Sequence, residues 1–555
     1  MKTFDGTRWN QNTNDTVSVK DFGAVGDGVT DDTSAIKSAI LSGAGKTVHF
    51  PSGRYKILEE LTIPNNTQIV GSGSSNTILD WSKKSTYSSG AYNSLIQWEK
   101  GTLSNSVSVP VNVLERDTKI DLGAGAGNYS SGDIIRISSD DVSFGESTRA
   151  EFQRILGIDG TVIELSSGVL DNYTPGNNIK VEKLTPVTGG FSGVTLVGKG
   201  PNPDGYADNA IQLFFTDNFI IDDVQFKEIE HRCIMLNSCI GTKVVNCNFF
   251  FNAAPIALQY GVGINGASQM TVVHNCTSYN DRHLVTTNST TSTSATFTYS
   301  RGIARIITVS SCTSTGSWQA PIDTHRSGEY ITVVGNTFTT ESTGIKIRGK
   351  RSMVIGNTMV GKLTSTTGTA IGIRVMMGCE DIQITGNLIK NFGSGVQIDG
   401  PDGETKSISV NGNTVVDCGY SVYLGGSADT LTGVSIINNQ FRSFTSGTPT
   451  PYCIYIVAST VDLTIQGNVI EGGSMGIYIS VPSVTQTDMV IKDNRFKSQS
   501  SHATFLRNIT NGMITGNYSS SAYRFTENTT NVYYGWNFGT LNDLSSGGIK
   551  TASWS

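Results

Sequence analysis

One short stretch of the sequence places an acid and an imidazole close together. It is "APIDTHR", residues 320–326, in which Asp323 and His325 are separated by a single residue. If the stretch is a β-strand, the two side chains lie on one face, about 7 Å apart. An aspartate and a histidine so placed can exchange protons with a substrate, as general acid–base catalysis requires. The pair could also be an ordinary ion pair on a solvated surface, and the residues alone leave both readings open.

Other polar residues fall at positions where strand alternation would place them on the same side as Asp323. We predict four catalytic groups: Asp323, His325, His283 and Glu329. Asp323 is the expected general acid or base, His325 tunes or shares its proton, and His283 acts as a second acid/base or orienting group. We predict that substrate is bound by cationic, aromatic and acidic side chains: Arg282, Trp318, Lys346, Arg348, Arg374, Asp399, Tyr423 and Tyr455. Aromatic faces and charged groups in this mixture suit a saccharide.

These residues need a scaffold that repeats, and the sequence contains a repeat. A motif of an apolar residue, any residue, a small or polar residue and then Asn or Cys recurs eleven times, from Cys247 to Asn517. Short alternating segments such as 343–349, 394–400 and 475–480 lie between the copies and have the period-two pattern of half-buried strands. The sequence therefore predicts an all-β solenoid, a parallel β-helix of stacked coils. We expect the recurring Asn side chains to form a structural ladder that has no part in the chemistry.

Other segments depart from this rhythm. Asp31, Asp32 and Thr33 precede apolar residues at helical spacing, so we expect a short amphipathic helix that caps the first coil. We predict a peptide over 1–18, the cap and first coils over 19–104, a small β insertion over 105–187, the main β-helix over 188–518 and a C-terminal tail over 519–555. The tail is rich in aromatic residues, namely Tyr533, Tyr534, Trp536 and Phe538. If they are exposed, these residues indicate a contact with another subunit.

Composition narrows the functional classes. The net charge is −6 and no long basic run occurs, which argues against a nucleic-acid partner. No apolar run reaches the length of a membrane span, and the first residues do not resemble a signal peptide. All eight cysteines follow residue 232 without a C-x-x-C motif, so we expect buried free thiols rather than disulfides or a zinc site. No cofactor or metal is predicted, although Asp281 and the candidate catalytic residues His283, Asp323 and His325 include metal-ligand types.

The opening of the chain resembles a known family. "VKDFGAVGDGVTDDTSAI" (19–36) and "VHFPSGRYKI" (48–57) are similar to the start of the pectate-lyase-like β-helix superfamily, especially its phage tailspike and capsule depolymerase branch. The resemblance continues through 149–187, 281–287 and 320–325. It implies a right-handed parallel β-helix, usually a homotrimer, that binds and usually cleaves a bacterial surface polysaccharide such as capsule or O-antigen. Only 18 residues precede this opening, from which we expect a truncated chain or a spike attached through a short peptide or a partner protein.

The resemblance also implies a location and partners. We expect a protein made in the host cytoplasm without a signal peptide and then placed on the virion tail, in contact with a phage tail or baseplate protein. The fold does not fix the chemistry, because the same cap precedes lyases, hydrolases and epimerases. The pectin hydrolases of this superfamily carry an Asn-Thr-Asp motif and an Asp-Asp pair on adjacent coils, and that arrangement is not found in this sequence.

Three functions remain open on the sequence alone. We favour glycosidic hydrolysis, which needs two carboxyl groups at a defined spacing. Asp399 would lie about 14 Å from Asp323, which is too far, so Glu329, Glu380 and Asp381 are candidates for the second carboxyl. The first alternative is a lyase that cleaves a uronic-acid-containing glycan by β-elimination, because cations surround Asp323. The second alternative is a receptor spike that binds the glycan without cutting it. A cell-encoded lyase or epimerase is disfavoured by the missing signal peptide.

Overall fold

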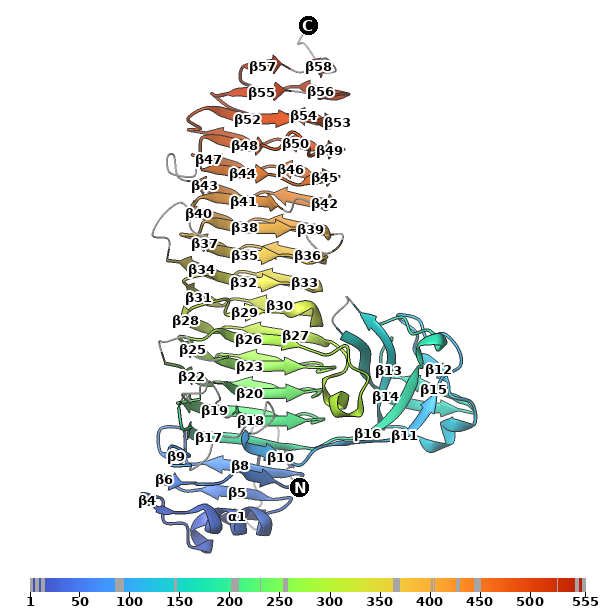
Figure 1. Cartoon of the computed structure of the whole chain (residues 1–555), viewed down its shortest axis with the longest axis vertical. Coiled ribbons are helices and arrows are strands. Elements are labelled where there is room, and N and C mark those ends of the chain that lie inside the picture. Colours follow the sequence, from blue (N-terminus) through green and yellow to red (C-terminus); the bar gives the residue numbers. More distant parts are fainter. Residues whose placement is uncertain are drawn as a thin grey trace. The chain divides into compact units, whose positions relative to one another are not determined.

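The structure is a computed structural model of the 555-residue chain. It describes 3–4, 9–10, 15–84, 94–143, 147–200, 209–229, 231–252, 258–362, 370–400, 403, 405–425, 430–443, 451–526, 528–544 and 549–551. The chain divides into two compact units, residues 1–308 and 309–555. Figure 1 labels the helices and strands of both units.

The first unit begins with a cap. Strand β3 (Thr16–Ser18), the 3-10 helix η2 (Val19–Phe22) and strand β4 (Asp27–Asp31) lead into helix α1 (Thr33–Ser42). The helix buries Ile36, Ala39 and Ile40 and leaves its other face exposed, so the predicted amphipathic capping helix is confirmed.

The helix N-terminus differs in detail from the sequence expectation. Asp32 occupies the N-cap position, but its carboxylate accepts hydrogen bonds from the backbone N–H groups of Val25 (2.5 Å) and Gly26 (3.1 Å). Asp31 accepts from the backbone N–H of Thr33 at 3.0 Å instead. The Asp-Asp pair therefore fastens the glycine-rich loop to the helix as well as closing its first turn.

The first unit continues as a stack of parallel coils. One of its sheets orders six parallel strands: β7 (Leu61–Ile63), β10 (Ser94–Trp98), β18 (Asn209–Phe214), β20 (Arg232–Asn237), β23 (Tyr260–Asn265) and β26 (His283–Asn288). Other sides of the coils include β5 (Thr47–Phe50), β8 (Thr67–Gly71), β17 (Gly189–Val197), β19 (Ile220–Lys227), β21 (Lys243–Val245), β22 (Asn248–Phe250), β24 (Val272–His274) and β25 (Thr277–Tyr279). Alternate apolar side chains of these strands fill the interior.

Between β10 and β17 the chain forms a separate antiparallel sheet. Its six strands are β11 (Thr102–Ser108), β12 (Lys119–Asp121), β13 (Ile134–Ser143), β14 (Ser147–Asp159), β15 (Val162–Leu165) and β16 (Lys180–Thr185). They enclose their own apolar core, which includes Ile135, Ile137, Ile163, Tyr173 and Val181. We call this sheet the insertion sheet; it differs from the coils in being wholly antiparallel.

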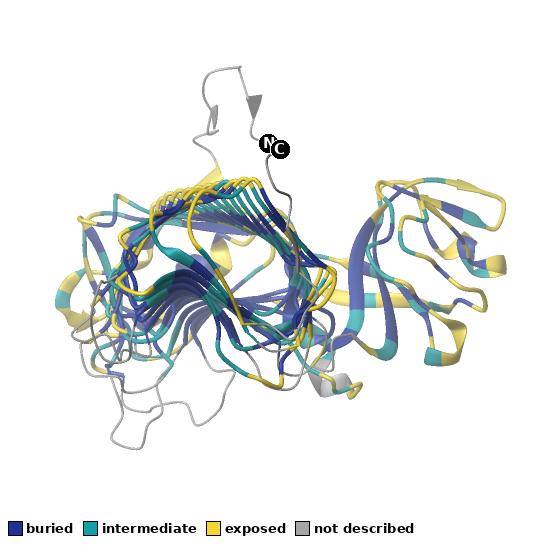
Figure 2. Cartoon of the chain, turned by 90° about the horizontal axis from the view of Figure 1, so that it is seen from above, coloured by how far each residue is buried: buried dark blue, intermediate teal, exposed yellow. Residues whose placement is uncertain are grey.

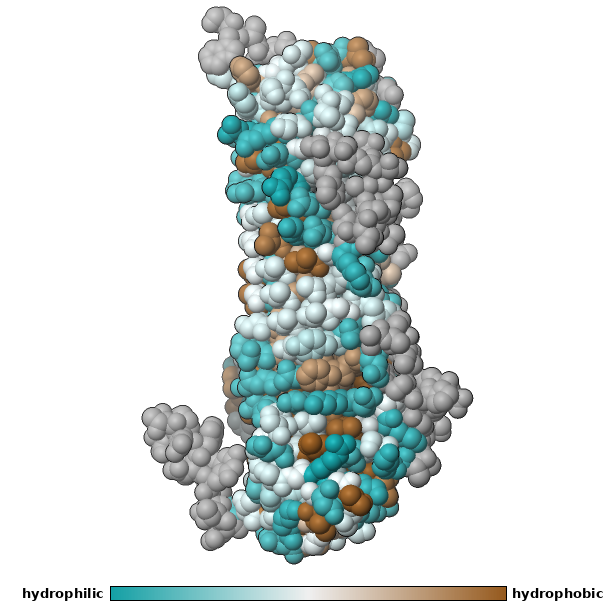
Figure 3. All heavy atoms as spheres, turned by 90° about the vertical axis from the view of Figure 1, so that its left-hand side faces the viewer, coloured by the Kyte–Doolittle hydropathy of each residue, from teal (hydrophilic) through white to brown (hydrophobic). Residues whose placement is uncertain are grey.

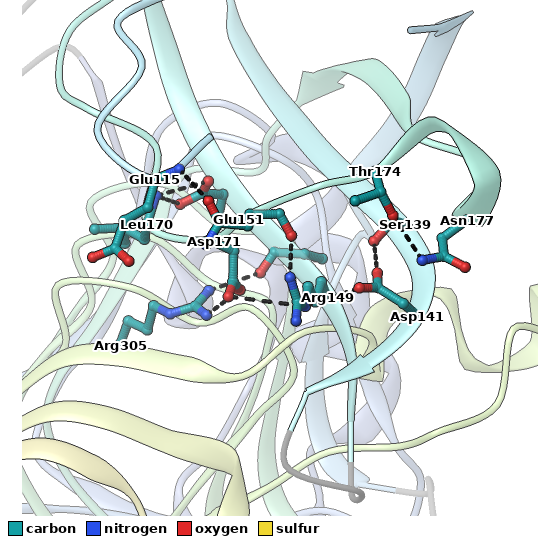
Figure 4. Close-up of polar contacts among 12 residues, drawn as sticks. Glu115, Ser139, Asp141, Arg149, Glu151, Leu170, Asp171, Thr174, Asn177 and Arg305 are labelled. Carbon is teal, nitrogen blue, oxygen red and sulfur yellow. Dashed lines mark hydrogen bonds and ion pairs between the residues drawn. The ribbon is translucent and has the colours of Figure 1, made fainter. Parts of the chain in front are cut away.

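Buried polar contacts fasten the insertion sheet to the coils of the first unit (Figure 4). The guanidinium of Arg305, on β27 (Ala304–Ser310), is fully buried and donates a hydrogen bond to Asp171. Glu151 of β14 is also fully buried, and both its carboxylate oxygens accept from the backbone N–H of Leu170 at 2.9–3.0 Å. Burial, only partly offset by the charge of Arg305, raises the pKa of Glu151 to about 8.

The second unit is a stack of coils, and its first coils have three strands each. One coil consists of β32 (Thr343–Ile347), β33 (Lys350–Ile355) and β34 (Thr358–Gly361), and each of these pairs in parallel with its counterpart in the next coil. The counterparts are β35 (Ile371–Val375), β36 (Glu380–Thr385) and β37 (Leu388–Lys390). Viewed from above, in Figure 2, the strands are largely buried and the turns between them are exposed. This is the parallel β-helix that the sequence predicted.

The first strand of each coil contributes to one long parallel sheet, called the front sheet here. In the second unit it contains β29 (Ile322–Asp323), β32, β35, β38 (Ser394–Asp399), β41 (Tyr420–Gly425), β44 (Tyr452–Ile456), β48 (Met475–Ile479), β52 (His502–Arg507), β55 (Ala522–Thr526) and β57 (Leu541–Leu544). The last of these strands lie beyond residue 518, so coil pairing continues into the segment that the sequence assigned to a tail. Tyr534 is accordingly buried, whereas Trp536 and Phe538 are exposed.

The recurring asparagines form the predicted ladder. From Asn336 to Asn537, each side-chain amide donates to the Oδ1 of the asparagine in the next coil at 2.8–3.0 Å. The same Oδ1 also accepts a backbone N–H, as in Asn413 to Asn439 at 2.8 Å. The ladder therefore satisfies buried polar groups in every coil it crosses. All eight cysteines are buried free thiols, as the sequence predicted.

Candidate functional site

One row of side chains crosses the outward face of the front sheet in the second unit. Its members are successive Cα partners in the sheet register: Asp323, Lys346, Arg374, Gln397, Tyr423, Tyr455, Tyr478, Phe505, Arg524 and Asn542. We call this set the outer row. The residues on either side of each member are mostly buried, as Ile345 and Ile347 are beside Lys346. Strand alternation therefore turns the outer row away from the core.

The first part of the outer row is ionic. Asp323 is only 3% exposed, and its carboxylate accepts from Arg348, whose Nε lies at 3.1 Å. The ammonium of Lys346 lies 3.4 Å from the other carboxylate oxygen. Two cations thus surround the Asp323 carboxylate and balance its charge. This arrangement suits Asp323 as an anchor that positions the cations Lys346 and Arg348.

A second carboxylate is held in the same way. Arg374 Nε donates to Asp399 at 2.7 Å, and the side-chain amide of Gln397 donates to the same carboxylate at 2.9 and 3.1 Å. Asp323 and Asp399 are separated by three steps of the sheet register, which at about 4.8 Å per step is roughly 14 Å. This spacing is too wide for the carboxyl pair of a retaining glycosidase and for that of an inverting glycosidase.

The middle of the face is aromatic. Tyr423, Tyr455 and Tyr478 of the outer row are flanked by Tyr420 and Tyr452, which are also Cα partners of each other. Tyr455 and Tyr478 stack with nearly parallel rings whose centroids are 5.6 Å apart, and Tyr452 and Tyr478 are 4.5 Å apart. We call these five residues the tyrosine cluster. A set of half-buried rings with hydroxyl groups offers apolar faces and polar edges to a bound sugar chain.

The surroundings of Tyr420 and Tyr423 favour the neutral form of their hydroxyl groups. Burial, helped by the neighbouring tyrosines, raises the pKa of Tyr420 to about 12. Burial and the nearby charge of Asp399 also raise the pKa of Tyr423. Both side chains therefore remain protonated and can donate hydrogen bonds to ligand oxygens.

The far end of the face carries two arginines. Arg507 and Arg524 each place a guanidinium over the ring of Phe505, with centroid distances of 5.1 and 5.0 Å. His502 lies on the same strand as Phe505, and burial together with the charge of Arg524 lowers its pKa.

His325 does not lie where strand alternation would place it. Strand β29 ends at Asp323, and His325 begins the 3-10 helix η6 (His325–Ser327) with a φ of +29°. The expectation that His325 shares a strand face with Asp323 is therefore wrong. The pattern "APIDTH" alternates for only two residues before the chain turns, and Asp323 Oδ1 lies 3.4 Å from the backbone N–H of His325, within this turn.

The remaining predicted acids and Trp318 lie around this turn or on another side of the coil. Glu329 is buried in β30 (Gly328–Val334), where its Cα partner is Lys350. Glu380 is bound by Lys350 at 2.9 Å and Lys406 at 3.2 Å; burial opposes but these two cations outweigh it and lower the pKa of Glu380. Trp318 is half-buried between β28 (Thr313–Ser317) and β29. Asp381 is exposed.

His283 and Arg282 belong to the first unit and form a cluster there. The imidazole of His283 packs on the ring of Tyr260 at 4.9 Å, and the guanidinium of Arg282 lies over the same ring at 5.7 Å. Arg232 approaches that ring equally closely. A joint action of His283 with Asp323 stays a prediction.

Some residues of the face were not singled out from the sequence: Tyr420, Tyr452, Phe505, Arg507 and Arg524. A signal for three of them is visible, since "YSVY" at 420–423, "YCIY" at 452–455 and "HATF" at 502–505 repeat a spacing of three residues at the same place in the coil. A strictly alternating strand would put the first residue of this motif on the opposite face from the last. In the structure both are half-buried while the two residues between them are mostly buried.

The described residues include no group of three or more His, Cys, Asp or Glu side chains that could hold a metal ion. In the same part of the chain, no helix is long and apolar enough to cross a membrane. Figure 3 shows the face that lies on the left-hand side of Figure 1. Polar and near-neutral residues cover most of the described part of this face, and apolar residues form small patches.

Comparison with known proteins supports the fold. Residues 16–119 match the family model of "Rhamnogalacturonase A/epimerase, pectate lyase-like", and residues 287–441 match that of the "Right handed beta helix region". Among solved structures, the tailspike gp61 of Pseudomonas phage phi297 is similar with a TM-score of 0.60 at 15% identity, over 94% of this chain and 82% of that chain. The Gp54 tailspike of Acinetobacter baumannii bacteriophage AP22, solved with a capsular saccharide, has a TM-score of 0.55 at 12% identity, over 89% and 77%.

Similarity to one curated sequence covers only a short stretch. The mannuronan C5-epimerase AlgE2 of Azotobacter vinelandii is 47% identical over 72 residues. This stretch is 11% of the present chain and 7% of the epimerase. The match therefore indicates a shared segment and does not indicate a shared activity.

Proposed function

Because this chain is a pectate-lyase-like right-handed β-helix protein with the fold of phage tailspikes, we propose that it is a tailspike depolymerase that binds and cleaves a bacterial surface polysaccharide. Its place of action would be the virion tail, as a homotrimer joined to a tail or baseplate protein. The observation that carries the proposal is the outer row, in which ionic, aromatic and again cationic side chains succeed one another along a single face.

The length of this face suits a polymer. Seven steps of the register separate Lys346 from Arg524, which is about 34 Å at 4.8 Å per step. A monosaccharide would touch only a small part of such a face, whereas an extended glycan can lie along it. Ring faces in the tyrosine cluster would stack on sugars, and the flanking charges would bind hydroxyl and acidic groups.

For the cleavage step, the ionic end favours β-elimination from a uronic acid. Lys346, Arg348 and Arg374 would balance the charge of the uronate carboxylate, which builds up as the neighbouring C5 proton is removed. The base would come from the turn that holds Asp323 and His325. The electron pair of the broken C5–H bond forms the C4–C5 double bond, the C4–O glycosidic bond breaks, and the departing oxygen takes up a proton.

Hydrolysis, which the sequence favoured, is the second candidate. It is supported by the presence of two buried carboxyl groups, Asp323 and Glu329, on either side of one turn. In this alternative Glu329 would be the second carboxyl group, and water would take the place of the departing sugar oxygen.

The test is incubation of the protein with purified capsular, O-antigen and teichoic polysaccharides, while reducing ends and the ultraviolet absorbance of an unsaturated uronate are followed together. We expect both signals, and we expect Asp323→Asn to lower the rate by about a hundredfold or more. New reducing ends without ultraviolet absorbance would show hydrolysis and contradict elimination. Binding of a glycan with neither signal would show a receptor spike and contradict the depolymerase.

A matched control is available in the same unit. Asp417 also pairs with two cations, Arg442 at 3.3 Å and Lys390 at 3.9 Å, but it lies on β40 (Thr414–Cys418), outside the front sheet. Asp417→Asn should keep full activity, and circular dichroism should show that both variants are folded. Equal activity of Asp323→Asn and Asp417→Asn would remove Asp323 from the site.

A further inference from the structure

We propose that Arg507 and Arg524, together with Phe505, form a remote subsite that binds the carboxylate of an acidic sugar. This inference rests on the proposed function and deepens it, because it assigns the ligand to acidic polysaccharides long enough to extend beyond the tyrosine cluster. Nothing in the ionic end near Asp323 is needed to build this subsite.

The geometry brings two like charges to one ring. Phe505 and Arg524 are Cα partners on β52 and β55, and Arg507 is two residues beyond Phe505 on its strand. Each guanidinium lies about 5 Å from the centroid of the phenyl ring. The ring attracts both cations, but the two positive charges repel each other. An anion that both guanidiniums contact would remove this repulsion.

Arg524 also has hydrogen-bonding capacity to spare. Its Nε is buried and has no hydrogen-bond partner among the described residues. Within the same described part of the chain, Arg524 makes no ion pair with a carboxylate. A buried donor without an acceptor is costly, and a bound carboxylate would supply the acceptor once the Arg524 side chain turns its Nε toward the ligand. A guanidinium is the side chain best matched to the two oxygens of such a group.

The ionic end of the face is different in this respect. There Arg348 and Lys346 are bound to Asp323, and Arg374 is bound to Asp399. An acidic ligand at that end has to share these cations with a protein carboxylate. Arg524 carries no such internal competitor among the residues described. We therefore expect it to contribute more to the affinity for an acidic polymer than its distance from Asp323 would suggest.

His502 supports this distribution of charge. It lies three residues before Phe505, and its pKa is lowered by burial and by the positive charge of Arg524. It is therefore neutral near pH 7, and the two arginines are the cations of the subsite. A neutral imidazole beside them can donate or accept a hydrogen bond with a sugar hydroxyl.

The experiment compares one polysaccharide in two forms. An acidic polysaccharide that the protein binds is converted to its carboxyl-reduced, neutral form, and both forms are titrated calorimetrically in an Asp323→Asn background, so that the chain is not cut. We expect Arg524→Gln to weaken binding of the acidic form by roughly tenfold or more and to leave the neutral form within about twofold. Arg524→Lys should retain part of the affinity because it keeps the charge.

Arg495→Gln is the matched control. Arg495 also lies over an aromatic ring, that of Tyr518 at 5.9 Å, in the same unit but on β51 (Arg495–Lys497), away from the front sheet. Arg495→Gln should not change the affinity for either form. Short acidic oligosaccharides that cannot reach from the ionic end to Phe505 should bind less tightly than the polymer.

The possible outcomes distinguish a failure of the subsite from a failure of the proposed function. Equal affinities of Arg524→Gln and Arg495→Gln for the acidic polymer would overturn the subsite and leave the depolymerase standing. If Arg524→Gln weakens the binding of the acidic and neutral forms equally, the subsite is also overturned, because the contact then does not depend on the charge of the ligand.

If the wild-type protein binds no polysaccharide at all, the proposed function and the subsite fail together. If Arg524→Gln melts at a lower temperature than the background protein, Arg524→Lys decides: loss of the preference for the acidic form in a folded Arg524→Lys would overturn the subsite.

Discussion

At the scale of single residues, the same residue types serve different purposes according to the side of the coil they occupy. Asparagine inside a turn donates and accepts at once and so completes the hydrogen bonding of two coils, as Asn413 does for Asn387 and Asn439. Arginine on the front sheet instead meets a carboxylate or an aromatic ring. The first use stabilises the fold, and the second places guanidinium groups along the front sheet.

The ladder makes a direct stability prediction. In Asn413→Ala the backbone carbonyl of Ile384 and the amide groups of Asn387 and Asn439 lose buried partners. We expect the free energy of unfolding to fall by about 3 kcal/mol or more, because each buried group left unpaired costs on the order of 1–3 kcal/mol. Chemical denaturation monitored by circular dichroism measures this. Gln440→Ala, at the exposed neighbour of Asn439, should change little; an equal loss in both variants would contradict a special role of the ladder.

At the scale of elements, the sequence predicted the repeating coils and the capping helix, but it missed contacts and turns that occur only once. Coils must place apolar residues and Asn at the same positions, so the β-helix and its ladder could be predicted from spacing alone. The contact between Arg305 and Asp171 joins residues that are 134 positions apart in the sequence, and no local sequence pattern predicts it. His325 was misplaced for a related reason: alternation predicts a strand, but a turn after two residues depends on the packing of this one coil.

The seam between the insertion sheet and the coils of the first unit predicts a dependence on pH. Glu151 has an ordinary pKa of 4.5, and in the folded protein burial raises its pKa to about 8. Between these two values the folded state holds a proton that the unfolded state has released, so this group makes stability fall as pH rises from about 4.5 to about 8. Below pH 4.5 its contribution is fully present.

Glu151→Gln removes this titration while keeping the shape of the side chain. Thermal unfolding of the wild-type protein and the variant across pH 5 to 9 checks the prediction, since other groups cancel in the difference. We expect the wild-type protein to lose stability relative to Glu151→Gln as pH rises toward about 8. A difference that is constant with pH, or that changes in the opposite direction, would show that Glu151 is ionised in the folded state.

At the scale of the whole molecule, both units are stacks of parallel β-coils, but they carry different additional elements and different side-chain clusters. The first unit carries the cap, the insertion sheet and the cluster of Arg232, Tyr260 and His283. The second carries the outer row on a more regular stack of coils. The likeness to phage tailspikes supports a fold held in common, while the chemistry of the face has to be established for this chain.

Assembly is the prediction at this scale. Trp536 and Phe538 are 61% and 62% exposed, and Phe538 stacks with the exposed ring of Tyr518 at 4.8 Å. Such a cluster is typical of a surface covered by another subunit. Sedimentation equilibrium should give three times the chain mass of 59.2 kDa, and replacing Trp536 and Phe538 by serine should shift the protein toward monomer. A wild-type protein that sediments as a monomer at micromolar concentration would contradict the trimer.

The central claim is that a long glycan lies along the front sheet of the second unit. The most direct measurement is a crystal structure of Asp323→Asn with a long oligosaccharide of a polysaccharide that the protein binds. We predict a chain that runs from Lys346 across the tyrosine cluster toward Arg524, with sugar rings on the faces of Tyr455 and Tyr478. A glycan bound at another surface, with the outer row left empty, would contradict the account.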